Sequence, residues 1–169
     1  MKSFIVLVSL LFGSVAGAEV KKGDHFVELD AKTAGGKHFR LKDMAGKWVL
    51  YTFGASWCEP CHKELPAWDK LAPKFAGKIL FVTVNINNKE AEGKEFIDSL
   101  KLKHLFPVFL PDENSPALKA YDPDRMPSTF VVDPQGTIQL IEYGYSAGDE
   151  TKLAAKLSEV LPQAIYHLT

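Results

Sequence analysis

The chain of 169 residues has little cysteine: Cys58 and Cys61 are all of it. A disulfide scaffold needs several bridges and a four-cysteine zinc site needs a second C-x-x-C, so neither is expected. Charge of one sign is also lacking, because 20 Lys and Arg face 21 Asp and Glu and the formal net charge is −1. With no run of five or six like charges, nucleic acid is not an expected partner. The G-x-G-x-x-G fingerprint is absent too, so no nucleotide or other cofactor is expected.

Long apolar segments are absent apart from one at the start of the chain. Residues 1–18, MKSFIVLVSLLFGSVAGA, combine a short positive n-region at Lys2, an apolar h-region and small residues up to Ala18. This pattern predicts a signal peptide that is cleaved after Ala18 and leaves residues 19–169 as the mature domain. The alternative is an uncleaved anchor, but the stretch is shorter than the roughly 20 apolar residues of a membrane span. We therefore expect export to a periplasm or a similar extracytoplasmic space.

No repeat and no Pro-, Gly- or Ser-rich linker divides the mature chain, so one α/β domain with a central mixed β-sheet flanked by helices is expected. Alternating runs at 25–29 and 37–41 predict an extra N-terminal hairpin that turns at Gly35-Gly36. A buried strand, a helix and a second buried strand follow, which predicts a parallel pair with a right-handed crossover. The expected elements after the hairpin are strands 48–53, 79–86 and 106–110, helices 58–75, 91–102 and 115–121, an antiparallel strand pair within 125–144, and a closing helix with Asp149 as its N-cap.

The two cysteines lie three positions apart in the stretch GASWCEPCHKELP, where a structural clip, half of a metal site and a redox-active pair are all open interpretations. A bridge across so short a loop removes little entropy from the unfolded chain, so a clip explains the pair poorly. If a helix begins at Cys58, its dipole and its free N–H groups lower the pKa of that thiol below the usual value of about 8.5. Cys58 is then an exposed nucleophile, and Cys61, almost one turn later and shielded from solvent, resolves the mixed disulfide.

The stretch FGASWCEPCHKELP, together with the later segment MPSTFVVDPQG, resembles the thioredoxin-like superfamily and in particular its exported TlpA/ResA/CcmG (DsbE) branch. The resemblance covers nearly the whole mature chain and implies a thioredoxin-like fold. It also implies that the Met126–Pro127 peptide bond is cis and that Pro127 faces the disulfide. The site residues that it implies are Cys58 and Cys61 as the catalytic pair, and Trp57, Met126 and Pro127 as the substrate-binding surface.

Proton transfer at Cys61 is the point at which the sequence departs from the family pattern. Thioredoxins place a buried aspartate on the strand beneath the cysteines, and Thr52 occupies that position here. A glutamate that follows the second core strand in some ResA-like members aligns with Asn88. Glu90 and Glu64 are the remaining candidates for proton transfer, although a surface position is the expectation for a glutamate.

The principal hypothesis is an exported thiol-disulfide oxidoreductase that uses its Cys-Glu-Pro-Cys site to reduce protein disulfides. The resemblance implies substrates such as the cysteines of apocytochrome c during cytochrome c maturation. Because no nucleotide site is visible, electrons are expected from a membrane thiol reductase of the CcdA or DsbD kind. We expect the protein to work as a monomer.

Two alternatives remain open and a third is disfavoured. A metallochaperone would hold Cu(I) with Cys58, Cys61 and either His62 or Met126, because soft sulfur ligands suit that ion. A binding module would keep the fold and use the two cysteines as a passive bridge. A peroxidase is disfavoured, because the T-x-x-C surroundings typical of peroxiredoxins are absent.

Overall fold

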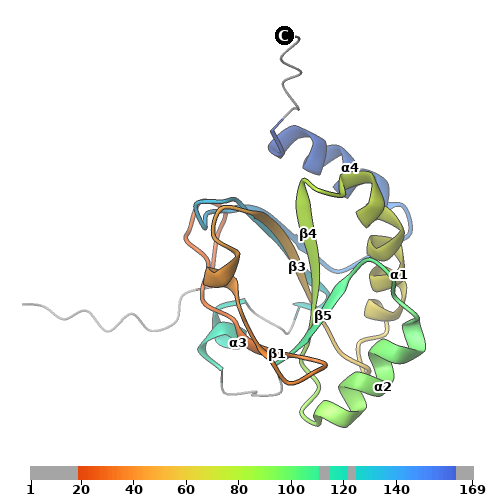
Figure 1. The fold of residues 1–169 in the computed structure, drawn as a ribbon. Helices are drawn as coiled ribbons and strands as arrows, with labels where there is room; N and C mark the ends of the chain where they lie inside the picture. The colour runs from red at the N-terminus through yellow and green to blue at the C-terminus, as the bar shows by residue number, and fades with distance from the viewer. Residues whose placement is uncertain (1–18, 111–114, 122–124, 163–169) are drawn as a thin grey trace, which may run out of the picture.

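The computed structural model describes residues 19–110, 115–121 and 125–162, so the predicted signal peptide lies outside the described residues. Its centre is a seven-stranded mixed sheet with the order β2-β1-β5-β4-β3-β6-β7 (Figure 1). The strands are β1 (Asp30–Thr33), β2 (His38–Arg40), β3 (Trp48–Gly54), β4 (Ile79–Asn85), β5 (Phe106–Phe109), β6 (Ser128–Val132) and β7 (Ile138–Tyr143). The helices are α1 (Cys61–Leu71), α2 (Glu90–Leu100), α3 (Pro116–Tyr121) and α4 (Asp149–Val160), with 3-10 helices η1 (Leu41–Met44) and η2 (Ala72–Phe75).

Strands β3 and β4 form the middle of the sheet and run parallel, in register from Trp48 opposite Ile79 to Gly54 opposite Asn85. Both are nearly continuous apolar runs, as expected for strands covered on both faces. β6 pairs antiparallel with β3 on the other side, and β7 pairs antiparallel with β6. The predicted parallel unit and the predicted antiparallel pair are therefore confirmed.

Helices cover both faces of this sheet. Figure 1 shows α1 and α2 on one side, and α3 on the other. The first face packs side chains of α1, α2 and α4, among them Trp68 and Leu157, against residues such as Leu50. The second face holds a cluster of aromatic rings in which Tyr51 and Phe130 stack at 5.5 Å. None of the helices in the described ranges has the length and hydropathy that a membrane span requires.

The N-terminal hairpin is present, but its first strand is not the one predicted. Strand β1 begins at Asp30, after the alternating run 25–29, and pairs antiparallel with both β2 and β5. Within that run, the N–H and the carbonyl of Val27 both bond to the Tyr121 hydroxyl, at 2.8 and 2.6 Å, so the backbone of Val27 is satisfied without a strand partner. The turn lies where predicted, with the N–H of Gly36 bonded to the carbonyl of Thr33 at 2.9 Å.

Helix α4 also begins slightly differently from the expectation. Its N-cap is Gly148, which has a φ of 98° that glycine adopts readily, and Asp149 is the first helical residue. The Asp149 carboxylate nevertheless closes the turn, because it accepts the N–H of Ser146 at 2.8 Å. Leu153 and Leu157 of this helix, and Leu161 directly after it, are buried.

Candidate active site

The two cysteines form a disulfide at the edge of the sheet where β3 gives way to α1. Their sulfur atoms are 2.01 Å apart and their Cα atoms 5.3 Å apart. Cys61 is completely buried, as predicted, with its Sγ 4.0 Å from the carbonyl oxygen of Phe53. The expected exposure of Cys58 is wrong for this oxidised form, because only 5% of Cys58 is accessible and it packs in the same apolar cluster as Cys61 and Leu65. Cys58 is still the more accessible of the two cysteine residues.

Helix α1 begins at Cys61, not at the predicted Cys58. Pro60 is the N-cap, and residues 58–60 form a turn in which the N–H of Cys61 bonds to the carbonyl of Cys58 at 3.0 Å. The N–H of Cys58 is itself bonded to the Ala55 carbonyl at 3.1 Å. The N–H groups of both cysteines are therefore already paired. The dipole of α1 can stabilise a Cys58 thiolate, but these two N–H groups are not available to donate hydrogen bonds to it.

The predicted substrate-binding residues lie at this edge of the sheet. Trp57 is 65% exposed, immediately before the disulfide. The Met126–Pro127 peptide bond is cis, which confirms that prediction. Met126 is partly buried and packs against the core cluster that contains both cysteines, and Ser128, next to Pro127, pairs with Phe53 of β3. Strand β6, which begins directly after Pro127, thus lies beside β3, the strand that leads to the disulfide.

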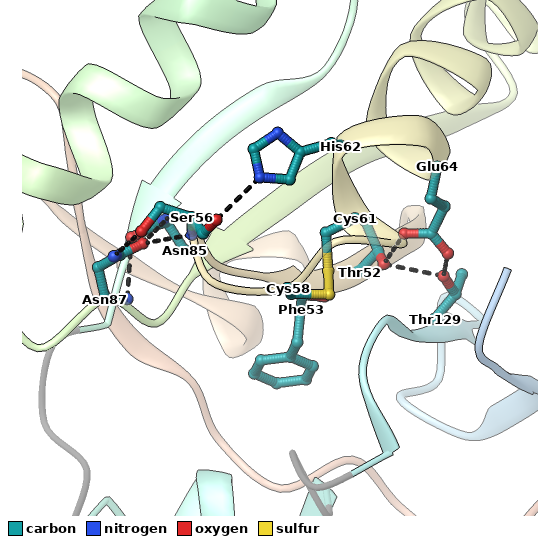
Figure 2. The surroundings of a disulfide bond; sticks show 10 residues. All are labelled: Thr52, Phe53, Ser56, Cys58, Cys61, His62, Glu64, Asn85, Asn87 and Thr129. Atoms are coloured by element: carbon teal, nitrogen blue, oxygen red, sulfur yellow. Dashed lines mark hydrogen bonds between the residues drawn. A yellow bond between two sulfur atoms is a disulfide. The ribbon is translucent and has the colours of Figure 1, made fainter.

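A network of amide side chains fixes the loop that precedes the disulfide. The Asn87 Oδ1 accepts the N–H of Ser56 at 3.0 Å, and its Nδ2 donates to the Ser56 hydroxyl at 2.6 Å (Figure 2). Asn85 at the end of β4 bonds to Asn87 in turn, and both asparagines are buried. On the other side of the loop, the Nε2 of His62 donates to the Ser56 carbonyl at 2.8 Å. This network, which the sequence did not reveal, anchors the active-site loop to β4 and α1.

Glu64 lies on the inner side of α1, one turn after Cys61, and only 1% of it is exposed. Its carboxylate accepts hydrogen bonds from the hydroxyl of Thr52 on β3 at 2.8 Å and from that of Thr129 on β6 at 3.0 Å. The two hydroxyls are also 2.9 Å from each other, and the indole N–H of Trp68 donates to Thr129 at 3.2 Å. Figure 2 shows this group on the opposite side of the disulfide from the asparagines.

Burial decides the protonation of Glu64. Removal from water raises its pKa from 4.5 to about 8, although the hydrogen bonds from Thr52, Thr129 and Trp68 lower it in part. A carboxyl group with this pKa changes its charge near neutral pH, as a proton donor or acceptor must. The carboxylate missing from strand position 52 is therefore supplied from helix α1, and the Thr52 hydroxyl contacts it directly.

The expected surface position is wrong for Glu64, and the other candidates lie outside this group. Glu90 forms an ion pair with Lys94 at 2.7 Å, and Asn88 is exposed. A signal for Glu64 is visible in retrospect, since it belongs to the same helical face as Cys61 and the apolar residues that follow. The threonines give no such signal, because only the register of three buried strands brings Thr52 beside Thr83 and Thr129.

The copper alternative gains no support from these side chains. In the described parts of the chain, no three or more His, Cys, Asp or Glu residues are grouped so that they could hold a metal ion. The His62 ring, one of the two predicted third ligands, points to the Ser56 carbonyl and packs against Phe96 at 4.8 Å. The cysteine sulfurs are bonded to each other.

Comparison with known proteins agrees with this geometry. Residues 22–141 match the family described as AhpC/TSA. The chain is 34% identical over 128 residues to the thioredoxin-like protein YneN of Bacillus subtilis, covering 74% of this chain and 73% of that protein. It is 32% identical over 146 residues to the thiol-disulfide oxidoreductase ResA of Bacillus thuringiensis, covering 84% of this chain and 78% of that one.

Solved structures show the same fold. A putative thiol:disulfide interchange protein DsbE from Chlorobium tepidum superposes with a TM-score of 0.74 at 26% identity, covering 83% of this chain and 98% of that one. The expected thioredoxin-like fold is confirmed by this match and by the mixed sheet with its flanking helices. The chain therefore belongs to the AhpC/TSA thioredoxin-like family, and it is a thiol-disulfide oxidoreductase of the ResA/DsbE type.

Proposed function

We propose that the protein is an exported reductant of protein disulfides in which Cys58 attacks, Cys61 resolves and Glu64 moves the proton. The Cys58 thiolate attacks one sulfur of a substrate disulfide, which forms a mixed disulfide and releases the other substrate sulfur as a thiolate. Cys61 then gives its proton to the Glu64 carboxylate and attacks the Cys58 sulfur. The second substrate sulfur leaves as a thiolate, and both substrate thiolates take up protons from solvent. Glu64 holds the Cys61 proton until it is released, and the enzyme is left with the disulfide seen in the structure.

The buried carboxyl of Glu64 is the observation that carries this proposal. A completely buried Cys61 cannot pass its proton directly to water, so a nearby group must accept it. Glu64 lies three residues along the same helix, where side chains share a face, and its pKa of about 8 allows it both to take the proton and to return it. A passive structural bridge has no need for such a group.

The direction, the compartment and the substrates rest on sequence features. The pattern of residues 1–18 supports export, and an exported enzyme without a nucleotide site requires a membrane thiol reductase of the CcdA or DsbD kind to restore its thiols. Similarity to proteins named ResA and DsbE supports substrates like theirs, and we propose that these include the cysteine pair of apocytochrome c before haem attachment. Trp57, Met126 and Pro127 form the proposed substrate-binding surface.

Trapping of the intermediate tests the enzyme mechanism. A Cys61→Ser variant retains the attacking thiol and lacks the resolving one, so it should accumulate mixed disulfides with exported proteins that carry cysteine pairs. Non-reducing electrophoresis followed by mass spectrometry identifies these partners, with Cys58→Ser as the matched control that should trap none. Equal trapping by both variants, or trapping by neither, would contradict the proposed roles of the two cysteines.

The direction of electron flow needs a separate measurement. A redox titration of the Cys58–Cys61 pair against dithiothreitol should give a potential well below that of the glutathione pool, because a reductant must hold its electrons weakly. A potential near that of a strong oxidant would overturn the reductant assignment and leave the oxidoreductase class intact.

A further inference from the structure

A second charged cluster lies beside the cis-proline segment, outside the disulfide and the Glu64 network. The Arg125 guanidinium stacks on the ring of Tyr143, with its central carbon 3.7 Å from the ring centroid. The carboxylate of Glu19 forms an ion pair with Arg125 and accepts a hydrogen bond from the Tyr143 hydroxyl at 3.0 Å. Arg125 and Tyr143 together thus hold a carboxylate through a charged donor and a neutral donor, while the ring fixes the plane of the guanidinium.

The cluster lies at the same edge of the sheet as the disulfide. Tyr143 pairs with Ser128, which pairs with Phe53, and the Phe53 carbonyl is the group near the Cys61 sulfur. Two strand spacings of about 4.8 Å place the Tyr143 backbone roughly 10 Å from that of Phe53, and the Tyr143 ring lies on the sheet face that carries Phe53 and Phe130. An extended peptide advances about 3.3 Å per residue, so this distance corresponds to about three residues of a bound substrate.

We propose that Arg125 and Tyr143 form an anion subsite that binds an acidic side chain of the substrate about three residues from the cysteine under attack. This inference rests on the proposed function, because it requires a substrate segment that passes the cis-proline. Glu19 occupies the subsite in the free protein and is replaced by the substrate carboxylate. The ligand class is an acidic segment of a protein substrate, and the effect is a preference among disulfides.

Exchange of one carboxylate for the other is feasible because the ion pair is exposed. The side chains of Arg125 and Glu19 are 43% and 45% accessible, and an exposed pair of this kind changes an equilibrium constant about fivefold at most. The backbone does not have to move, since Val20 is buried and its N–H bonds to the Ala120 carbonyl at 3.0 Å, so only the Glu19 side chain swings away. A substrate carboxylate tethered by the mixed disulfide has an effective concentration on the order of millimolar, which lets it compete.

Matched peptides test the subsite. Disulfide-bonded peptides are made in pairs whose members differ at one position, where one has Glu and the other Gln. In one set of pairs this position is the third residue before the target cysteine, and in the other set it is the third residue after it. The rate constant for their reduction by the fully reduced protein is measured for the wild type and for Glu19→Gln, Arg125→Gln and Tyr143→Phe. Tyr143→Phe removes one hydroxyl and keeps the ring beneath Arg125, so it separates the hydrogen bond from the stacking.

With the competing carboxylate removed, Glu19→Gln should reduce one of the Glu peptides about two to five times faster than its Gln partner. The wild type should show a smaller ratio, Tyr143→Phe a ratio lower than the wild type, and Arg125→Gln a ratio of one. Salt near 1 M should abolish the preference. Equal rates for Glu19→Gln on every peptide pair, or an undiminished preference in Arg125→Gln, would overturn the subsite. Failure of the wild type to reduce any peptide would instead overturn the proposed function.

Discussion

Replacement of Glu64 by glutamine should stabilise the oxidised protein, increasingly so as the pH rises. The pKa of Glu64 is about 8 in the folded protein and 4.5 as a free side chain, because burial penalises the charged form. The stability associated with the protonated carboxyl is fully present below about pH 4.5 and is lost as the pH rises to about 8. Glutamine retains the shape and hydrogen-bonding groups of the protonated acid and has no charge to lose.

The size of this stabilisation follows from the thermodynamic linkage between proton binding and folding. The folded and unfolded values differ by about 3.5 pH units, and each unit corresponds to about 1.4 kcal/mol, so the full effect is about 5 kcal/mol. The free energy of unfolding of Glu64→Gln minus that of the wild type should be near zero at pH 4.5. It should reach about 3 kcal/mol at pH 7 and level off above pH 8.

Urea unfolding followed by tryptophan fluorescence from pH 4.5 to 9 measures this difference directly. Glu90→Gln is the control, because the hydrogen bond and charge of Lys94 lower the pKa of that carboxyl. Its difference curve should be small and of opposite sign, with the variant slightly less stable at higher pH. A flat curve for Glu64→Gln would show that Glu64 ionises in the fold as it does in water, and the proposed proton transfer would lose its basis.

Two further variants test contacts that support the site. One carboxylate oxygen of Asp69 accepts the N–H groups of residues 103, 104 and 105 at 2.9, 2.7 and 3.0 Å. Asp69→Ala should therefore lower the free energy of unfolding by about 2–4 kcal/mol, and Asp69→Asn by about 1 kcal/mol. Equal losses in the two variants would contradict this account. Gly93→Ala places a methyl group 2.1 Å from the Asn85 amide oxygen and should cost about 1–3 kcal/mol by urea unfolding despite the better helix propensity of alanine. The exposed Glu95→Ala on the same helix should change stability by less than about 0.5 kcal/mol, and a similar value for both would refute the close contact.

The central fold could be predicted because its signals are local and strong. β3 and β4 are runs of apolar residues bounded by polar or small ones, and composition alone distinguishes them from their surroundings. The first hairpin strand was misplaced because alternation reports burial rather than pairing. Leu29 in the run 25–29 is completely buried, yet the backbone of Val27 bonds to a tyrosine side chain from α3 instead of a strand. Hydrogen-bond partners so distant in the chain leave no local pattern.

The cysteine pair and the cis peptide bond could be predicted from the sequence, whereas the side chains that surround them could not. The cysteine spacing and the cis-proline are carried by short motifs, which sequence displays directly. The burial of Glu64 depends on Thr52 and Thr129, which come from strands that are adjacent only after folding. The helix start was misplaced because Pro60 and the turn at residues 58–60 satisfy the backbone before the helix begins. The ion pair between Glu19 and Arg125, 106 positions apart, left no trace in the sequence.

The hydroxyl of Thr129 has one proton and two acceptors within reach, Glu64 and Thr52. When Glu64 is ionised, both threonines can donate to it; when it is protonated, it becomes a donor itself and the Thr129 proton can turn to Thr52. Helix α1, β3 and β6 therefore remain joined in either charge state, with the donors merely rotated. The proposed transfer of a proton to and from Glu64 therefore requires rotation of two hydroxyl groups and no movement of the backbone.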